Sequence, residues 1–240
     1  MRIHLLAPCT GRKTRRGPAL DLARLADWHA GRLSAADAGP LTPAADLYDG
    51  LGHRLMMWGI EAFRAHGGGG VTLHVVSAGL GIVGEREPVP NYEATFNAMR
   101  GARRAAWLGT LDLPRRVAAA LSTPADLRLV LLGREYLDAT GLQTLALPPG
   151  SPPTVVLAAP SAAGLVPAGA LHVPLAMPEA RRFHATLIAL KGALVRRLLS
   201  DAGLWRRPDV GALPAWRDAA AFLDLCAACP DGDDREPGTP

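Results

Sequence analysis

Side chains that could do chemistry lie in short polar segments of this sequence, each directly after an apolar stretch. Residues 3–8 are apolar and are followed by Cys9, Thr10, Arg12 and Lys13. The apolar residues 71–76 are followed by Ser77, Gly79 and Gly81, and then by Asn91, Tyr92 and Glu93. Thiol, amine, hydroxyl and carboxylate groups at such points are typical of a binding or catalytic site rather than of a core.

Residues 9–14 (CTGRKT) resemble a phosphate-binding P-loop only in part. That motif needs a glycine, four residues, and then Gly-Lys-Ser/Thr. Here Arg12 separates Gly11 from Lys13, and Ala7 stands where the first glycine belongs. We therefore do not expect nucleoside triphosphate hydrolysis.

Glu93 is the first candidate for a catalytic carboxylate. It follows Tyr92 after a Pro-Val-Pro stretch that stiffens the loop, and a carboxylate held in this way can orient water or stabilise a cation. The alternative is an exposed carboxylate that caps a helix at residues 94–104. Asp49 and Glu135 are rival acids. His53 lies off the apolar stripe of its predicted helix and could reach the cleft, but we expect it to be exposed.

Three cysteines indicate a reducing cytoplasm rather than a disulfide framework. Cys9 is either a nucleophile or a small residue that closes a strand. Cys226 and Cys229 form a lone C-x-x-C pair without a second pair of ligands, so we expect core packing and no metal.

The chain is mildly basic, with 26 Lys and Arg residues, a net charge of +4 and a pI of about 9.3. Lys13 and Lys191 are its only lysines. Arg12, Lys13, Arg15 and Arg16 share one loop, and a second basic group has helical spacing, at Arg100, Arg103 and Arg104. Both groups are either solvated faces or phosphate contacts beside one cleft.

Strand and helix patterns alternate along the chain. Strands are expected at 3–8, 71–79, 127–136, 154–161 and 170–175, and helices at 47–66, at 98–121 with a break at Pro114, at 179–200 and at 213–229. The alternation predicts an α/β fold: a three-layer sandwich around a parallel-rich sheet of four or five strands. In such sheets, ligands bind beyond the carboxyl ends of the strands, which is where the polar segments fall.

The predicted organisation is one domain over residues 1–229, with a helical extension from about 201, and a disordered tail at 230–240. The tail is charged and rich in Pro and Gly. No apolar stretch reaches the roughly 20 residues of a membrane span, and the start of the chain has no signal-peptide pattern. We expect a cytoplasmic protein without a membrane partner.

Taken together, four of these motifs resemble those of the DUF6884-type family. They are Pro8-Cys9 with Lys13, residues 44–48 ending at Tyr48, residues 77–81, and Asn91-Tyr92-Glu93. They cover roughly residues 1–100. The family is similar to the catalytic domain of archaeosine synthases and to the peroxide-stress proteins, and the wider group resembles uracil-DNA glycosylases in fold. One departure is Glu93, where the family usually has Asp.

The resemblance implies work on a nucleobase within nucleic acid, without a cofactor. The leading hypothesis is a DNA glycosylase that flips a modified or damaged base into a pocket and excises it, with a role in phage defence suggested only by the wider group. The alternatives are a transferase that modifies a deazaguanine in RNA and a non-catalytic DNA-binding stress protein.

The predicted roles divide the candidate residues into three sets. Glu93 and Asp49 are the catalytic carboxylates. The base is bound by Cys9, Thr10, Tyr48, Ser77, Gly79, Gly81, Asn91 and Tyr92. Phosphates are bound by Arg12, Lys13, Arg100, Arg103 and Arg104.

Overall fold

The structure is a computed structural model that describes residues 1–14, 18–67 and 69–229. Arg15, Arg16 and the predicted tail at 230–240 lie outside the described residues. The chain forms an α/β fold around a mixed, mostly parallel sheet with the strand order β4-β3-β1-β6-β7-β8. The strands are β1 (Arg2–Pro8), β3 (Gly70–Ser77), β4 (Gly81–Gly84), β6 (Leu127–Val130), β7 (Thr154–Ala158) and β8 (Leu171–Pro174). Two short strands, β2 (Thr42–Pro43) and β5 (Pro88–Val89), pair separately.

Helices cover the sheet because its central strands are apolar on both faces. Successive residues of β1 and β7 are buried, and this pattern is typical of a parallel sheet between two layers. The helices are α1 (Leu22–His29), α2 (Ala35–Ala38), α3 (Ala44–Leu47), α4 (Leu51–Ala65), α5 (Gly101–Leu111), α6 (Leu113–Leu121), α7 (Arg134–Thr140), α8 (Met177–Arg182), α9 (Leu187–Ser200), α10 (Ala202–Trp205) and α11 (Ala219–Ala228).

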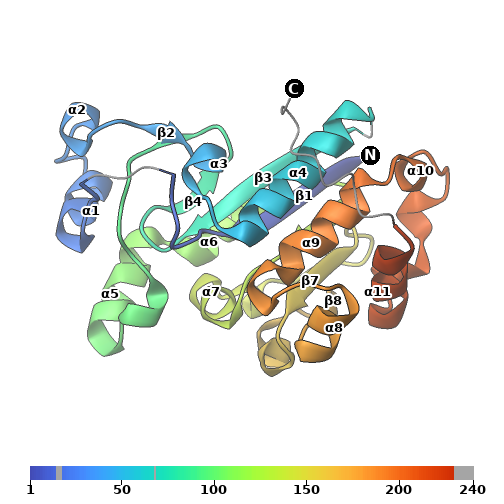
Figure 1. The fold of residues 1–240 in the computed structure, drawn as a ribbon. Coiled ribbons are helices and arrows are strands. Elements are labelled where there is room, and N and C mark those ends of the chain that lie inside the picture. The colour runs from blue at the N-terminus through green and yellow to red at the C-terminus, as the bar shows by residue number, and fades with distance from the viewer. Residues whose placement is uncertain (15–17, 68, 230–240) are drawn as a thin grey trace.

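Helices α4 and α9 lie side by side across one face of the sheet (Figure 1). Glycines allow this close approach. A Cβ atom on Gly192 of α9 would lie 1.9 Å from the Gly52 carbonyl oxygen of α4, and one on Gly59 would lie 2.7 Å from the Cα of Arg196. The starts of both helices therefore meet beyond the ends of β1 and β6.

Five predicted strands are present, and β1 pairs with β3 in one sheet as expected. The third strand was predicted too long, because it ends at Val130 and residues 134–136 begin α7. The sixth strand, β4, was not predicted. It runs antiparallel to β3 after the turn at residues 77–81.

The long helix predicted at 179–200 is two helices. The chain turns at His184, whose φ is +50°, and α9 then starts at the N-cap residue Thr186, whose side chain accepts a hydrogen bond from the Ala189 N–H. His53 is also a correction: it is 5% exposed, and its Nε2 bonds to the Ala45 carbonyl oxygen at 2.9 Å. Cys226 and Cys229 are buried, as the packing prediction required.

Candidate active site at the carboxyl ends of the strands

The order of the strands creates a switch point between β1 and β6. From β1 the chain continues to β3 and β4 on one side of the sheet, and later to β6, β7 and β8 on the other. Ligands of open α/β sheets bind at such points, beyond the carboxyl ends of the strands. A pocket of about 390 Å³ lies there, lined by Ala7, Pro8 and Cys9 from the end of β1 and by Leu131 just after β6.

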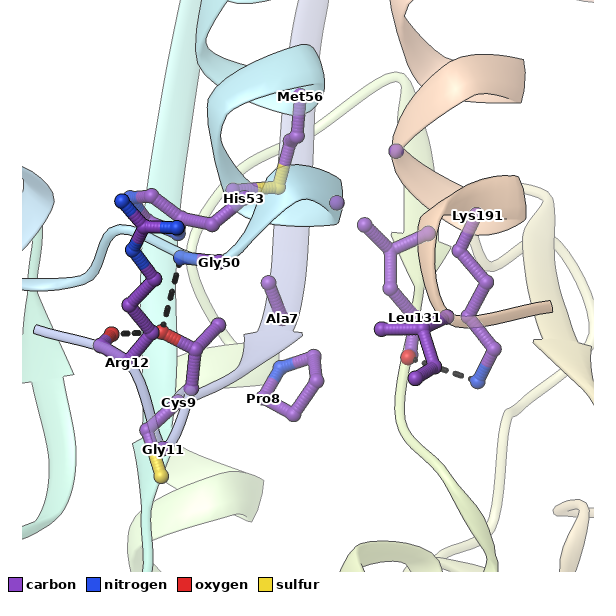
Figure 2. A pocket seen from close by; sticks show the side chains of 14 residues that line it. Ala7, Pro8, Cys9, Gly11, Arg12, Gly50, His53, Met56, Leu131 and Lys191 are labelled. Atoms are coloured by element: carbon purple, nitrogen blue, oxygen red, sulfur yellow. Dashed lines mark hydrogen bonds between the residues drawn. The ribbon is translucent and has the colours of Figure 1, made fainter. Parts of the chain in front are cut away.

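The wall of this pocket is mostly apolar, with a cationic residue on each of two sides. Met56 of α4 and Ile188 of α9 contribute apolar side chains. Arg12 and Lys191 lie on opposite sides of the pocket (Figure 2). None of the described lining residues is acidic, but Arg12 pairs with Asp49 at 2.7 Å, so a ligand would meet only the remaining N–H donors of Arg12 and Lys191.

Lys191 is a buried cation in the pocket wall. Its Nζ donates hydrogen bonds to the carbonyl oxygens of Leu131 at 2.9 Å and Leu132 at 2.8 Å. These bonds use two of the three donors of an ammonium group. Burial lowers the pKa of Lys191 to about 8 because a low-polarity surrounding disfavours the charged form.

None of the three tyrosines of the chain lines this pocket, but one of them, Tyr136, contacts the lining residue Cys9. The Tyr48 and Tyr92 hydroxyls are 3.0 Å apart, and the Ser77 hydroxyl donates to Tyr92 at 2.7 Å. The Cys9 thiol, which also lines the pocket, lies 3.1 Å from the Tyr136 hydroxyl. Burial raises the pKa of all three phenols, so they act as neutral hydrogen-bonding groups.

Tyr48 and Tyr92 are 2% and 0% exposed, so in this structure they support the site from behind rather than line an open wall. The Ser77 turn was predicted to contact a base edge, but the Ser77 hydroxyl already forms hydrogen bonds within the protein. Ser77 Oγ accepts from the Gly79 and Leu80 N–H groups at 3.2 and 2.9 Å. A Cβ on Gly79 would lie 2.5 Å from the Tyr92 ring, and one on Gly81 would meet Arg116. The glycines therefore serve packing within the protein.

Lys13 lies over the ring of Tyr92, whose hydroxyl contacts those of Tyr48 and Ser77. Its Nζ is 4.4 Å from the centroid of the Tyr92 ring, and its backbone forms a bridge with Tyr48. Burial lowers the pKa of Lys13, and the charges of Cys9 and Glu93 partly oppose that shift. The segment after β1 carries the thiol of Cys9 and the amine of Lys13, and the segment after β5 brings the carboxylate of Glu93 within electrostatic reach of that amine.

The three candidate acids differ in their surroundings. Asp49 pairs with Arg12 at 2.7 Å and with Arg54 at 3.7 Å. Glu135 lies 3.9 Å from Arg104 at the start of α7. Glu93 is exposed, and its N–H donates to the Leu20 carbonyl oxygen at 2.9 Å, which fixes its backbone beside Leu20. Of the three, Glu93 is the acid whose charge acts on Lys13.

The second basic group reaches the same edge of the sheet through α5. Trp107 of α5 donates to the Ala78 carbonyl oxygen at 2.8 Å and so anchors the helix at the end of β3. Arg103 is exposed, whereas Arg104 pairs with Asp138 at 2.7 Å. Arg100 precedes the helix and donates to the Met99 carbonyl oxygen. Arg103 is therefore the residue of this group best placed to meet a phosphate.

The remaining predicted base contacts divide between the pocket and its surroundings. Thr10 lines the pocket, but its hydroxyl donates to the Arg12 carbonyl oxygen at 2.6 Å. The carbonyl oxygen of Asn91 accepts from the Leu20 N–H. Lys191 and Tyr136 were not predicted. Lys191 had one available signal, since it is a charge among the buried apolar positions of α9.

Comparisons of the chain with family models, with curated proteins and with solved structures found no match. Among the helices of the described residues, none combines the length and apolarity that crossing a membrane requires.

Proposed function

We propose that this chain is a DNA glycosylase, which hydrolyses the N-glycosidic bond of a modified or damaged base. The observation that carries the proposal is the pocket at the β1–β6 switch point, with Arg12 at its side and Lys13 next in sequence. A volume of about 390 Å³ falls within the usual range for small-molecule sites. The glycosylase-like fold implied by the resemblance belongs to this proposal.

In this account the base leaves the stack and enters the pocket, because an enzyme cannot reach the bond of a stacked base. Ile188 contacts one face of the base, with the buried Met56 behind the pocket wall, and Lys191 faces the oxygen atoms of the base. Arg12, Lys13 and Arg103 bind the flanking phosphates. An apolar pocket beside basic groups suits a neutral ring attached to an anionic backbone.

Glu93 stabilises the positive charge that develops on the sugar. Glycosidic cleavage passes through an oxocarbenium-like state, which a nearby carboxylate favours and which water then attacks. Asp49 is the weaker candidate because two arginines already neutralise its charge.

The direct test incubates the protein with a panel of normal, damaged and hypermodified DNAs and identifies released free bases by mass spectrometry. We expect one class of modified base to be released, leaving alkali-sensitive abasic sites. Binding without any released base would support the DNA-binding alternative. A mass gain on tRNA in the presence of an amine would instead support the transferase.

A further inference from the structure

The amine of Lys13 has surroundings that differ from those of a surface lysine. The side chain is partly buried, and its Nζ lies over the Tyr92 ring at 4.4 Å from the centroid. A ring face attracts a cation without the full neutralisation that a carboxylate gives. The contact therefore holds the amine over the ring without an ion pair to a carboxylate of the described residues.

Buried groups fix the position of this amine. The Tyr92 ring is held by hydroxyl contacts to Tyr48 and Ser77. The backbone of Lys13 is bridged to Tyr48, and the Thr14 N–H donates to the Leu47 carbonyl oxygen at 2.9 Å. Both the side chain of Lys13 and its main chain are thus tied to one rigid unit, as a reacting group requires.

Burial, rather than the neighbouring charges, favours the neutral and nucleophilic form of the Lys13 amine. Burial lowers the pKa of Lys13, so a larger fraction of the amine is neutral near pH 7 than in an ordinary lysine. The charges of Cys9 and Glu93 partly oppose this shift in the pKa of Lys13. Glu93 is also placed to accept and return protons during addition to a carbonyl.

We propose that Lys13 forms a covalent imine with the C1′ aldehyde of an abasic deoxyribose. This inference rests on the proposed function, because removal of a base generates that aldehyde. The neutral Nζ adds to the C1′ carbon as the C=O π bond breaks, and one proton passes from the nitrogen to the former carbonyl oxygen. The resulting carbinolamine loses one water molecule as the C=N bond forms, and no oxidant or reductant is needed.

The chain offers only one other lysine for comparison. Lys191 is held against the far wall of the pocket by the Leu131 and Leu132 carbonyl oxygens. Lys13 instead follows Arg12, which pairs with Asp49 but has a side chain that is 69% exposed, so its remaining N–H donors can meet the sugar–phosphate backbone. In this proposal the amine of Lys13 meets the sugar, whereas the amine of Lys191 faces the base.

The test uses the full chain and an oligonucleotide with an abasic site made beforehand, so it does not depend on base release. Sodium borohydride reduces an imine to a stable amine and joins the protein to the DNA. We expect a one-to-one adduct that peptide mass spectrometry assigns to Lys13. The Lys13→Arg variant keeps the positive charge, and we expect it to lose at least tenfold in adduct yield while its circular dichroism spectrum stays unchanged.

Arg86→Lys is the matched control. It adds an ordinary lysine where the present side chain is 90% exposed, and we expect no adduct at that position. No adduct with wild-type protein, or an adduct on Lys191 or the N-terminal amine, would overturn the proposal. Base release without trapping would refute this inference alone. Trapping at Lys13 without base release from any DNA would refute the proposed glycosylase activity alone.

Discussion

At the scale of single residues, Glu93 and Asp49 are carboxylates with opposite surroundings. Glu93 is exposed and acts on Lys13, whereas Asp49 is paired with Arg12 and Arg54. We predict that Glu93→Gln lowers single-turnover base release about a hundredfold, the scale of acid–base catalysis. DNA affinity should change little because glutamine keeps the shape of the side chain. If Glu93→Gln releases the base at the wild-type rate and Asp49→Asn does not, the catalytic carboxylate is Asp49.

His4 makes the stability of the fold depend on pH. Its Nε2 lies 2.9 Å from His74 Nδ1, and burial, followed by the charges of His74 and Arg128, lowers the pKa of His4 to about 4. The unfolded chain has a His pKa near 6.5, so it binds more protons between these values. Stability therefore falls as the pH drops from about 6.5 to about 4.

We predict a loss on the order of 3 kcal/mol from His4 over that window, from the relation between pKa and free energy. Urea unfolding at pH 7.5 and pH 5 measures part of it. In His4→Gln, the free energy of unfolding should differ less between the two pH values than it does in the wild type. His66→Gln, at an exposed helix end, should leave that difference as in the wild type. An equal difference in both variants would exclude His4 as the cause.

Some of the site residues could be recognised in the sequence and others could not. Cys9, Lys13 and Glu93 stand directly after apolar strands or a stiffened loop, so their types and positions indicated a site. The burial of Tyr48 and Tyr92 depends on packing between segments 44 residues apart, which no local pattern reports. Lys191 lies still farther along the chain, and only the topology of the sheet brings it to the pocket.

At the scale of elements, the packing of α4 on α9 shapes the pocket. A Cβ on Gly192 would lie 1.9 Å from the Gly52 carbonyl oxygen, so Gly192→Ala must push the helices apart. We predict a loss of about 1–3 kcal/mol in the free energy of unfolding, the usual cost of overpacking.

Gly109→Ala provides the control for this change. Gly109 lies in α5, and nothing lies within 4 Å of a Cβ there. The Gly109→Ala variant should be as stable as the wild type or more stable by up to about 1 kcal/mol, because alanine favours the helix. Equal melting temperatures for Gly192→Ala and wild type would show that the two helices tolerate separation.

The periodic elements were predictable because hydrophobic alternation and stripes are local signals. The parallel strands and α4 follow from these patterns. The edge strand β4 was missed because Gly81 and Gly84 at its ends resemble a loop. The end of β6 was misjudged because the apolar run continues through Leu131 and Leu132, which are buried without being in a strand.

At the scale of the whole molecule, basic residues should attach the protein to a nucleic acid backbone. Arg103 on α5 is exposed at the site edge, and α10 lies at the other end of the molecule (Figure 1). We predict that Arg103→Ala reduces the slope of log K against log salt by about 0.9, the value for one phosphate. Arg206→Ala, just after α10, should leave the slope unchanged. Equal slopes for Arg103→Ala and wild type would remove Arg103 from the interface.

The central claim is that a base is removed inside the pocket at the switch point. Ile188 lines that pocket and is 87% exposed, whereas the neighbouring Leu187 is 47% exposed and is not among the lining residues. The decisive measurement is single-turnover base release by Ile188→Trp and Leu187→Trp. We predict that an indole across the pocket lowers release at least tenfold in Ile188→Trp and leaves Leu187→Trp near the wild-type rate. Equal release by both variants and the wild type would contradict the claim.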